Sequence, residues 1–230
     1  STASDVATWE GAPDSNDWNF DDANAGLTIE GWIKPDDLDF GASNDAVLFG
    51  QLRSNSGTGD LYGVGIHITD DKLYGIAGTN DTSWKTLHSA GSGGAVTASD
   101  YLTAGKWTHL AFTVDDHDTT TPVGKFYIDG KLVAQNTGST NLYWSYAFVI
   151  GGHAYNSDGQ NHNPMRFDGT IARVSAWKWD LTAAEIRAMM FHDFDALTAD
   201  DTNFPDSRVG DGVQFDDCRL WYQFDEGTGI

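Results

Sequence analysis

The chain has 230 residues, of which 40% are hydrophobic, so it is long enough to bury one sizeable core as a single domain. It carries 34 acidic residues against 13 basic ones, a net charge of -21, and this field repels nucleic acid and anionic membranes, which are therefore not expected partners. The single cysteine, Cys218, excludes an internal disulfide framework.

The first predicted strands follow an irregular N-terminal segment. Residues 1–26 are polar and rich in Asp and Asn, with Trp9, Trp18 and Phe20 as candidate anchors. Strands are predicted at 27–34, 46–52, 61–69 and 72–78. The third has the period of two that a strand requires, with Tyr62, Val64, Ile66 and Ile68 facing one way and Gly63, Gly65 and His67 the other. Asp70-Asp71 is expected to form the tight turn into the fourth.

The second half of the chain predicts further strands and one hairpin. Residues 79–105 are rich in Ser, Thr and Gly, with a short strand expected around Trp84 and Leu87. Strands resume at 107–115, 124–129, 131–136, 146–151 and 169–178. The first of these alternates Leu110, Phe112 and Val114 with His109, Ala111 and Thr113. Asp129-Gly130 predicts a two-residue hairpin turn, because a type I′ turn needs positive φ angles.

A short helix and a closing strand are predicted near the C-terminus. The helix occupies about 182–192, since Thr182 and Glu185 form a capping box. Ile186, Met189 and Met190 give it an apolar stripe, which we expect to contact the core. Residues 193–216 are expected to form an Asp-rich loop, and a closing strand is predicted at 217–225.

Segments along the chain, in the order of one known family, resemble that family. W-T-H-L-A-F-T-V-D at 107–115, followed by K-F-Y-I-D-G-K-L-V at 125–133, resembles the central strands of laminin-G-like domains, which belong to the concanavalin A-like lectin/glucanase superfamily. The segments at 27–35, 167–177 and 181–186 resemble that family's opening strand, a later strand and the following helix. The resemblance implies an all-β, antiparallel jelly-roll β-sandwich with one short C-terminal helix, forming a single domain over 1–230. Ala172-Arg173 replaces the family's usual acidic pair, so any role of those acids is in doubt.

The C-terminal segment L-W-Y-Q-F-D-E-G-T-G at 220–229 resembles the first strand of such domains and not the last. Either the domain is circularly permuted and this strand completes its own sheet, or it completes the sheet of a neighbour. Closure within the chain is the simpler alternative, because chain termini commonly lie close together. Strand exchange would suit an assembly. We expect Leu220, Tyr222 and Phe224 to pack in their own sandwich.

The catalytic motifs that this fold can carry are missing, and no enzyme activity is expected. Glucanases of the family resemble one another in E-x-D-x-x-E, which aligns two carboxylates on one face of a strand. Here the only glutamates are Glu10, Glu30, Glu185 and Glu226, and the adjacent Asp pairs would point to opposite faces. His109 is expected to be a structural, hydrogen-bonded histidine. Core or sheet-face positions are expected for Trp32, Trp107, Trp177 and Trp179.

Two segments hold the candidate contact residues. Tyr143, Trp144 and Tyr146 could form an exposed aromatic surface for a sugar or a protein. The polar loop at 152–164 should lie at the rim of the sandwich, where it offers further contacts through His153, Tyr155, Asn161 and His162. Its oxygen atoms suit calcium, with Asn156, Asp158, Asn163 and Asp168 as candidate ligands, although the spacing is not that of an EF-hand. A hydrated loop without a ligand is the alternative, and no cofactor is required.

These features favour a non-enzymatic structural or decorating module of an extracellular assembly, with a bacteriophage virion as the expected setting. The helix at 184–191 resembles that of laminin-G-like proteins of marine phages. The alternative is a calcium-assisted, lectin-like module that binds a cell-surface glycan. The expected partner is thus a protein, such as a capsid subunit, or a glycan. No signal peptide or membrane span is recognised, so the protein either stays in the cytoplasm or leaves by a route that needs no N-terminal signal, such as cell lysis. With the setting above, a virion or extracellular location is expected.

Overall fold

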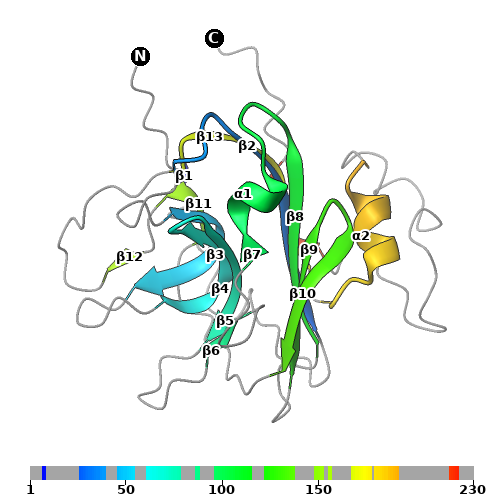
Figure 1. Cartoon of the computed structure of the whole chain (residues 1–230). Coiled ribbons are helices and arrows are strands. Elements are labelled where there is room, and N and C mark those ends of the chain that lie inside the picture. Colours follow the sequence, from blue (N-terminus) through cyan, green and yellow to red (C-terminus); the bar gives the residue numbers. More distant parts are fainter. Residues whose placement is uncertain are drawn as a thin grey trace.

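The computed structural model describes residues 7–8, 26–39, 46–54, 61–78, 86–88, 96–115, 122–137, 148–152, 155–156, 167–177, 179–191 and 218–222. These residues form two β-sheets that pack face to face, with one helix on the outside (Figure 1). The pairing is antiparallel except where β12 joins β3. The predicted antiparallel β-sandwich with a short helix is confirmed.

One sheet contains eight of the described strands. Its main order is β1 (Ala7–Thr8), β11 (Val149–Gly152), β3 (Ala46–Ser54), β4 (Leu61–Thr69), β5 (Lys72–Gly78) and β6 (Thr86–His88). Two short strands lie off this path: β7 (Val96–Thr97) pairs with β5, and β12 (Tyr155–Asn156) with β3. The helix α1 (Ala98–Tyr101) follows β7.

The other sheet contains six of the described strands. Their order is β10 (Lys131–Thr137), β9 (Val123–Ile128), β8 (Thr108–Val114), β2 (Leu27–Pro35), β13 (Gly169–Trp177) and β14 (Cys218–Tyr222). The helix α2 (Ala183–Met189) lies on its outer side (Figure 1). This sheet therefore faces the first sheet on one side and α2 on the other.

The alternation predicted for β8 is confirmed, and both of its faces are buried. Leu110, Phe112 and Val114 join the core cluster between the sheets. On the outer face, Ala111 packs in a second cluster that includes Ile186 and other α2 residues. Strand β8 is thus sandwiched between the core and the helix.

The turn and cap predictions are also confirmed. Asp70-Asp71 and Asp129-Gly130 both have positive φ at each position, which is the geometry of a two-residue type I′ hairpin. Thr182 and Glu185 form the complete capping box of α2. The helix ends at Met189, earlier than expected, with Met190 as its C-cap. Ile186, Met189 and Met190 are buried in the second cluster, as predicted.

Some strand limits differ from those predicted. Strand β8 begins at Thr108, because its pairing with β2 ends at Ile33 opposite Thr108. Trp107 therefore lies beyond the pairing and is 43% exposed, so its predicted place within the strand was wrong. The strand predicted at 146–151 begins at Val149. Trp9, Trp18, Phe20 and Trp84 lie outside the described residues.

The C-terminal strand pairs with its own chain. In β14, Leu220 lies opposite Ala176 and Tyr222 opposite Val174 of β13. The strand therefore closes its own sandwich at the edge of the six-stranded sheet, as the simpler alternative predicted. It is shorter than the predicted 217–225, and Phe224 lies outside the described residues.

Deleting residues 217 to 230 should therefore leave β13 as an exposed sheet edge and lower the free energy of unfolding by several kcal/mol, because a paired strand with large apolar side chains is lost. Urea unfolding and size-exclusion chromatography would measure the effect. A truncation of 226 to 230, which leaves β14 in place, is the control. A monomeric protein of unchanged stability after the longer deletion would contradict the closure.

Candidate functional site

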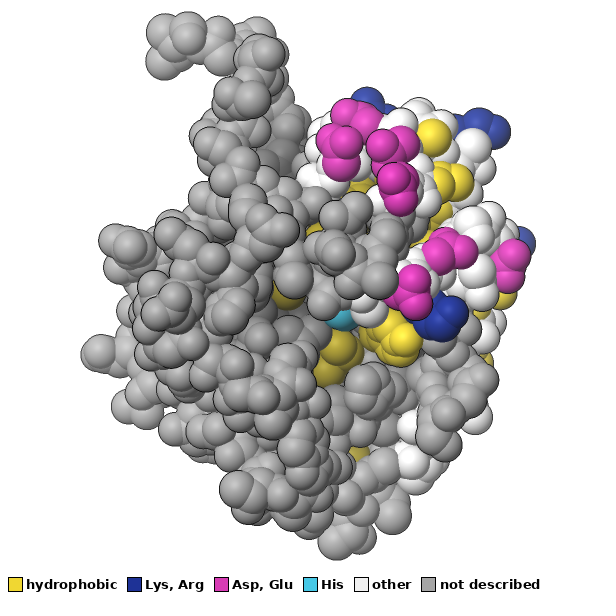
Figure 2. Space-filling model, turned by 60° about the vertical axis from the view of Figure 1, so that its left-hand side comes forward, with side chains coloured by type: hydrophobic (Ala, Val, Ile, Leu, Met, Phe, Trp, Pro, Cys, Tyr) yellow, Lys and Arg dark blue, Asp and Glu magenta, His cyan; other side chains and the backbone are white. Residues whose placement is uncertain are grey.

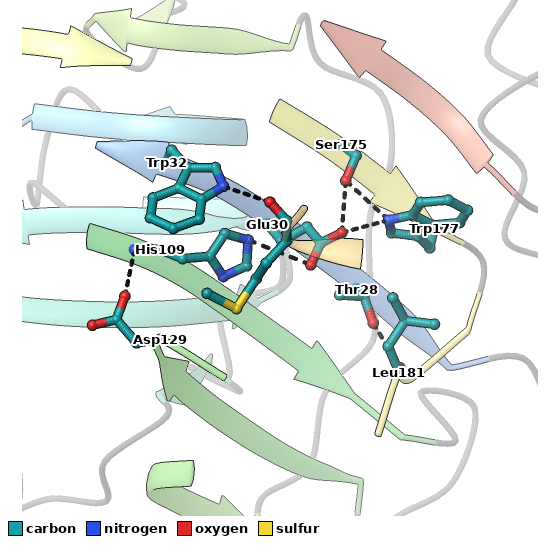
Figure 3. Close-up of polar contacts among 9 residues, drawn as sticks. Thr28, Glu30, Trp32, His109, Asp129, Ser175, Trp177 and Leu181 are labelled. Atoms are coloured by element: carbon teal, nitrogen blue, oxygen red, sulfur yellow. Dashed lines mark hydrogen bonds and ion pairs between the residues drawn. The ribbon is translucent and has the colours of Figure 1, made fainter. Parts of the chain in front are cut away.

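The outer face of the six-stranded sheet contains a buried polar cluster beneath α2. Glu30 comes from β2, His109 from β8, and Ser175 and Trp177 from β13 (Figure 3). Each occupies a position whose neighbours along the strand face the core between the sheets. Glu30 is 3% exposed and His109 2%, so both ionisable groups are removed from water.

A β-bulge in β13 brings the cluster together. Ala172 lies opposite Trp32, but the register then shifts by one residue, so that Ser175 and not Val174 lies opposite Glu30. Within the bulge, Arg173 has φ +50°, a left-handed conformation that is unusual for a residue other than glycine. The shift turns the Ser175 hydroxyl toward the carboxyl group and returns Val174 to the core. The pair Ala172-Arg173, which departs from the usual acidic pair, thus lies at the β-bulge.

One oxygen of the Glu30 carboxyl group accepts two hydrogen bonds. Its Oε1 accepts from Ser175 Oγ and from Trp177 Nε1, both at 3.0 Å (Figure 3). Its Oε2 lies 3.6 Å from His109 Nε2 and has no hydrogen-bond partner. The other ring nitrogen of His109, Nδ1, also has no hydrogen-bond partner. The predicted structural role of His109 is consistent with its burial, and its backbone N–H donates to Asp129 Oδ1.

Burial shifts both ionisable groups toward their neutral forms. Desolvation raises the pKa of Glu30 to about 7, although the hydrogen bonds from Ser175 and Trp177 act in the opposite direction. Desolvation lowers the pKa of His109 to about 3. Near neutral pH, His109 is therefore uncharged and Glu30 is poised between its two forms, so the contact between them is not an ion pair of full charges.

The cluster lies among the contacts that hold α2 and its flanking residues on the sheet. The Thr28 hydroxyl donates to the Trp179 carbonyl and accepts from the Leu181 N–H. At the other end of the helix, Trp32 Nε1 donates to the Met190 carbonyl at 3.1 Å (Figure 3). Because Glu30 and His109 are buried, the arrangement serves to position the helix on the sheet.

Next to this covered region, the same sheet face is open. Lys34 Nζ lies 5.3 Å from the centre of the Trp107 ring, and the Trp32 ring lies 5.9 Å from that of Phe191. Phe191 is 71% exposed. Trp107 was expected in the core or sheet face, and sequence patterns gave no signal of its exposure, which depends on where the β2–β8 pairing ends.

The residues predicted to form the site are mostly outside the described part of the chain. This applies to Tyr143, Trp144, Tyr146, His153, Asp158, Asn161, His162 and Asn163. Tyr155 and Asn156 form β12, which runs parallel to β3. Asp168 is exposed just before β13, where its carbonyl accepts the N–H of Asp36. The predicted contact and calcium residues therefore stay predictions.

The buried cluster itself was missed by sequence reasoning, although a signal was present. Glu30 is the only charged residue within the apolar run 27–33, and a carboxyl group in the middle of a strand needs a partner if both faces are covered. What the sequence could not show was the bulge that places Ser175 opposite it.

Acidic side chains dominate the described surface in places. Figure 2 shows one face on which they gather toward the upper right. Among the described residues, no group of three or more His, Cys, Asp or Glu side chains is arranged to hold a metal ion. None of the described helices is long and apolar enough to cross a membrane.

The raised pKa of Glu30 predicts a pH-dependent stability. Between the ordinary pKa of 4.5 and the folded-state pKa of about 7, the folded protein keeps a proton that the unfolded chain releases. The free energy of unfolding therefore falls as pH rises through this window. Glu30→Gln lacks this proton, so its stability relative to the wild type should rise between about pH 5 and about pH 8, by on the order of 3 kcal/mol.

Urea unfolding of both proteins across this pH range would measure the difference. His109 acts in the opposite direction, because its pKa is lowered in the folded state. Its contribution to stability is complete above its ordinary pKa of 6.5 and is lost as pH falls toward 3. Both proteins retain His109, so the difference between them reports mainly on Glu30. Ser175→Ala, which keeps the carboxyl group, is the control and should retain the wild-type direction. A difference that does not change with pH would contradict the assignment.

Residues 8–187 match the Laminin_G_3 family, described as the concanavalin A-like lectin/glucanases superfamily. No curated protein matches the sequence.

Solved structures with a similar arrangement include a SAP-like pentraxin from Limulus polyphemus, with 16% identity, a TM-score of 0.45, and coverage of 72% of this chain and 70% of that one. A putative carbohydrate binding protein from Bacteroides ovatus has 16% identity and a TM-score of 0.49, with coverage of 96% of this chain and 49% of the other. The receptor binding domain of botulinum neurotoxin C/D mosaic serotype has 15% identity and a TM-score of 0.47, with coverage of 72% and 35%. This chain thus spans about half of the second structure and a third of the third.

The family match extends over well more than half of the length of this chain. The chain therefore belongs to the concanavalin A-like lectin/glucanases superfamily.

Proposed function

We propose that this chain is a non-enzymatic module that binds glycans. Its superfamily is named for two activities, sugar binding by lectins and sugar cleavage by glucanases. The observation that carries the choice between them is the structural use of both described glutamates, Glu30 and Glu185.

Glycoside hydrolysis by the common mechanisms needs two carboxyl groups that flank the scissile bond, one acting as acid and the other as base or nucleophile. Glu30 is buried and bonded to Ser175 and Trp177. Glu185 is 1% exposed, and its Oε2 accepts the Thr182 N–H in the capping box. Neither carboxyl group can reach a sugar, so neither described glutamate can serve as the acid, base or nucleophile of a glucanase. Glu10 and Glu226 lie outside the described residues.

The location where such a module acts is a second part of the proposal. We propose a virion or extracellular location, with decoration of a bacteriophage capsid or tail as the specific case. Glycan binding would then attach the particle to a cell surface. Mass spectrometry of purified virions, together with a genomic neighbourhood of capsid and tail genes, would test this setting. Absence of the chain from such particles would contradict it.

The proposed function predicts binding without turnover. The purified chain should bind a subset of a glycan array, and it should release no reducing sugar from β-glucans during prolonged incubation. A catalytically active glucanase is the positive control for the second assay. Steady release of reducing sugar that is lost when a single Asp is replaced by Asn would contradict the proposal.

Calcium assistance is a separate proposal that rests on the rim loop. Asp158 and Asp168, together with oxygens of Asn156, Asn161 or Asn163, would give weak binding with a dissociation constant on the order of 10⁻⁴ to 10⁻³ M. At ten times that concentration, calcium would stabilise the fold by about 1.4 kcal/mol. Melting curves in calcium and in chelator should therefore differ by a few degrees, and Asp168→Ala should remove the difference. Superimposable wild-type curves would contradict a calcium site.

A further inference from the structure

The open part of the six-stranded sheet carries aromatic side chains next to one lysine. Lys34 and Trp32 occupy outward positions of β2, two residues apart, so they stand on the same face. Trp107 precedes β8 and contacts Lys34, while Phe191 follows α2 and contacts Trp32. We call Trp107, Lys34, Trp32 and Phe191 the open aromatic surface.

The structure holds this surface in place before any ligand arrives. Trp32 is fixed by its hydrogen bond to the Met190 carbonyl and by an edge contact with His109, with ring centres 5.3 Å apart. The turn before Trp107 is tied to β2, because the Gly105 N–H donates to the Pro35 carbonyl at 2.7 Å. A preformed surface loses little conformational entropy on binding, which favours recognition of a ligand.

Charge restricts the class of ligand. The chain has a net charge of -21, so a second copy, a nucleic acid or an anionic membrane would be repelled. A neutral molecule with an apolar face and several hydroxyl groups feels no such repulsion. Its apolar face can cover an exposed indole, and its hydroxyl groups can accept hydrogen bonds from a lysine ammonium group.

We infer that Trp107 and Lys34 form a sugar-binding subsite for a neutral pyranose, centred on the open aromatic surface and separate from the rim loop. This inference rests on the proposed glycan-binding function and places it on described residues. The C–H face of the sugar would stack on the exposed part of the Trp107 ring. Lys34 would donate to a ring or hydroxyl oxygen, and Trp32 and Phe191 would border an adjoining sugar unit.

The chain offers a matched control for the tryptophan. Tyr101, on α1, is an aromatic residue that is 45% exposed, compared with 43% for Trp107, and it has no part in the open aromatic surface. Trp107→Ala and Tyr101→Ala therefore remove aromatic rings of similar exposure from different places. Trp107→Phe keeps a ring at the site, and Lys34→Met keeps the length of the side chain without its donors.

The experiment begins with the wild-type chain on a glycan array, followed by calorimetric titration of the best neutral ligand. Trp107→Ala should weaken binding about tenfold or more, as for the loss of an aromatic anchor. Lys34→Met should weaken it by roughly threefold to tenfold. Tyr101→Ala should bind as the wild type does, and Trp107→Phe should keep most of the affinity. Melting temperatures of all variants would show that each is folded.

The outcomes separate this inference from the function on which it rests. Wild-type binding that is unchanged in Trp107→Ala would overturn the subsite and leave glycan binding intact. A wild-type chain that binds no glycan would overturn the proposed function, and the subsite with it. Affinity for a neutral sugar should not depend on salt, because no ligand charge is screened. Binding restricted to acidic sugars and weakened by salt would show that the ligand class is wrong.

Discussion

The burial of the Glu30 carboxyl group constrains much of the six-stranded sheet. A carboxyl group removed from water must be neutralised or hydrogen-bonded, and here both responses occur: its pKa is raised to about 7, and Ser175 and Trp177 donate to it. The donors are available only because the bulge in β13 shifts the register by one residue, with Arg173 in a left-handed conformation. The helix α2 then covers the adjoining apolar side chains, so strand geometry, helix position and protonation depend on one another.

This arrangement divides the outer face of the sheet into two regions with different roles. Beneath α2, the side chains of Ala111, Tyr127 and Trp177 pack with the helix and are closed to ligands. Beyond its C-terminal end, Trp32 joins the covered region to the open one, since it touches His109 on one side and Phe191 on the other. The closed region stabilises the domain, and the open region is where a ligand can reach an aromatic ring held by the same framework.

Glutamates could suggest catalysis on this fold, but here they serve structure. Glu30 stabilises the sheet surface, and Glu185 caps the helix that covers it. Both are thereby withdrawn from any chemistry with a sugar, whereas the exposed rings of Trp107 and Phe191 are not engaged in the core. Fold membership alone does not decide between binding and cleavage, and in this chain the two described glutamates are used for structure.

The sequence by itself determined the features that depend on neighbouring residues. The tight turn at Asp70-Asp71, the type I′ turn at Asp129-Gly130, the capping box of Thr182 and Glu185, and the alternation of β8 were all predicted, because backbone conformation and side-chain period are local properties. Tertiary structure alone decided the partners of Glu30: Ser175 is 145 residues away, and a bulge places it opposite. It also decided that β14 closes its own sheet and that Trp107 is exposed, since both depend on which strands pair and where the pairing ends. These contacts are selected by the register between strands that are far apart in the sequence, and not by the local residue pattern.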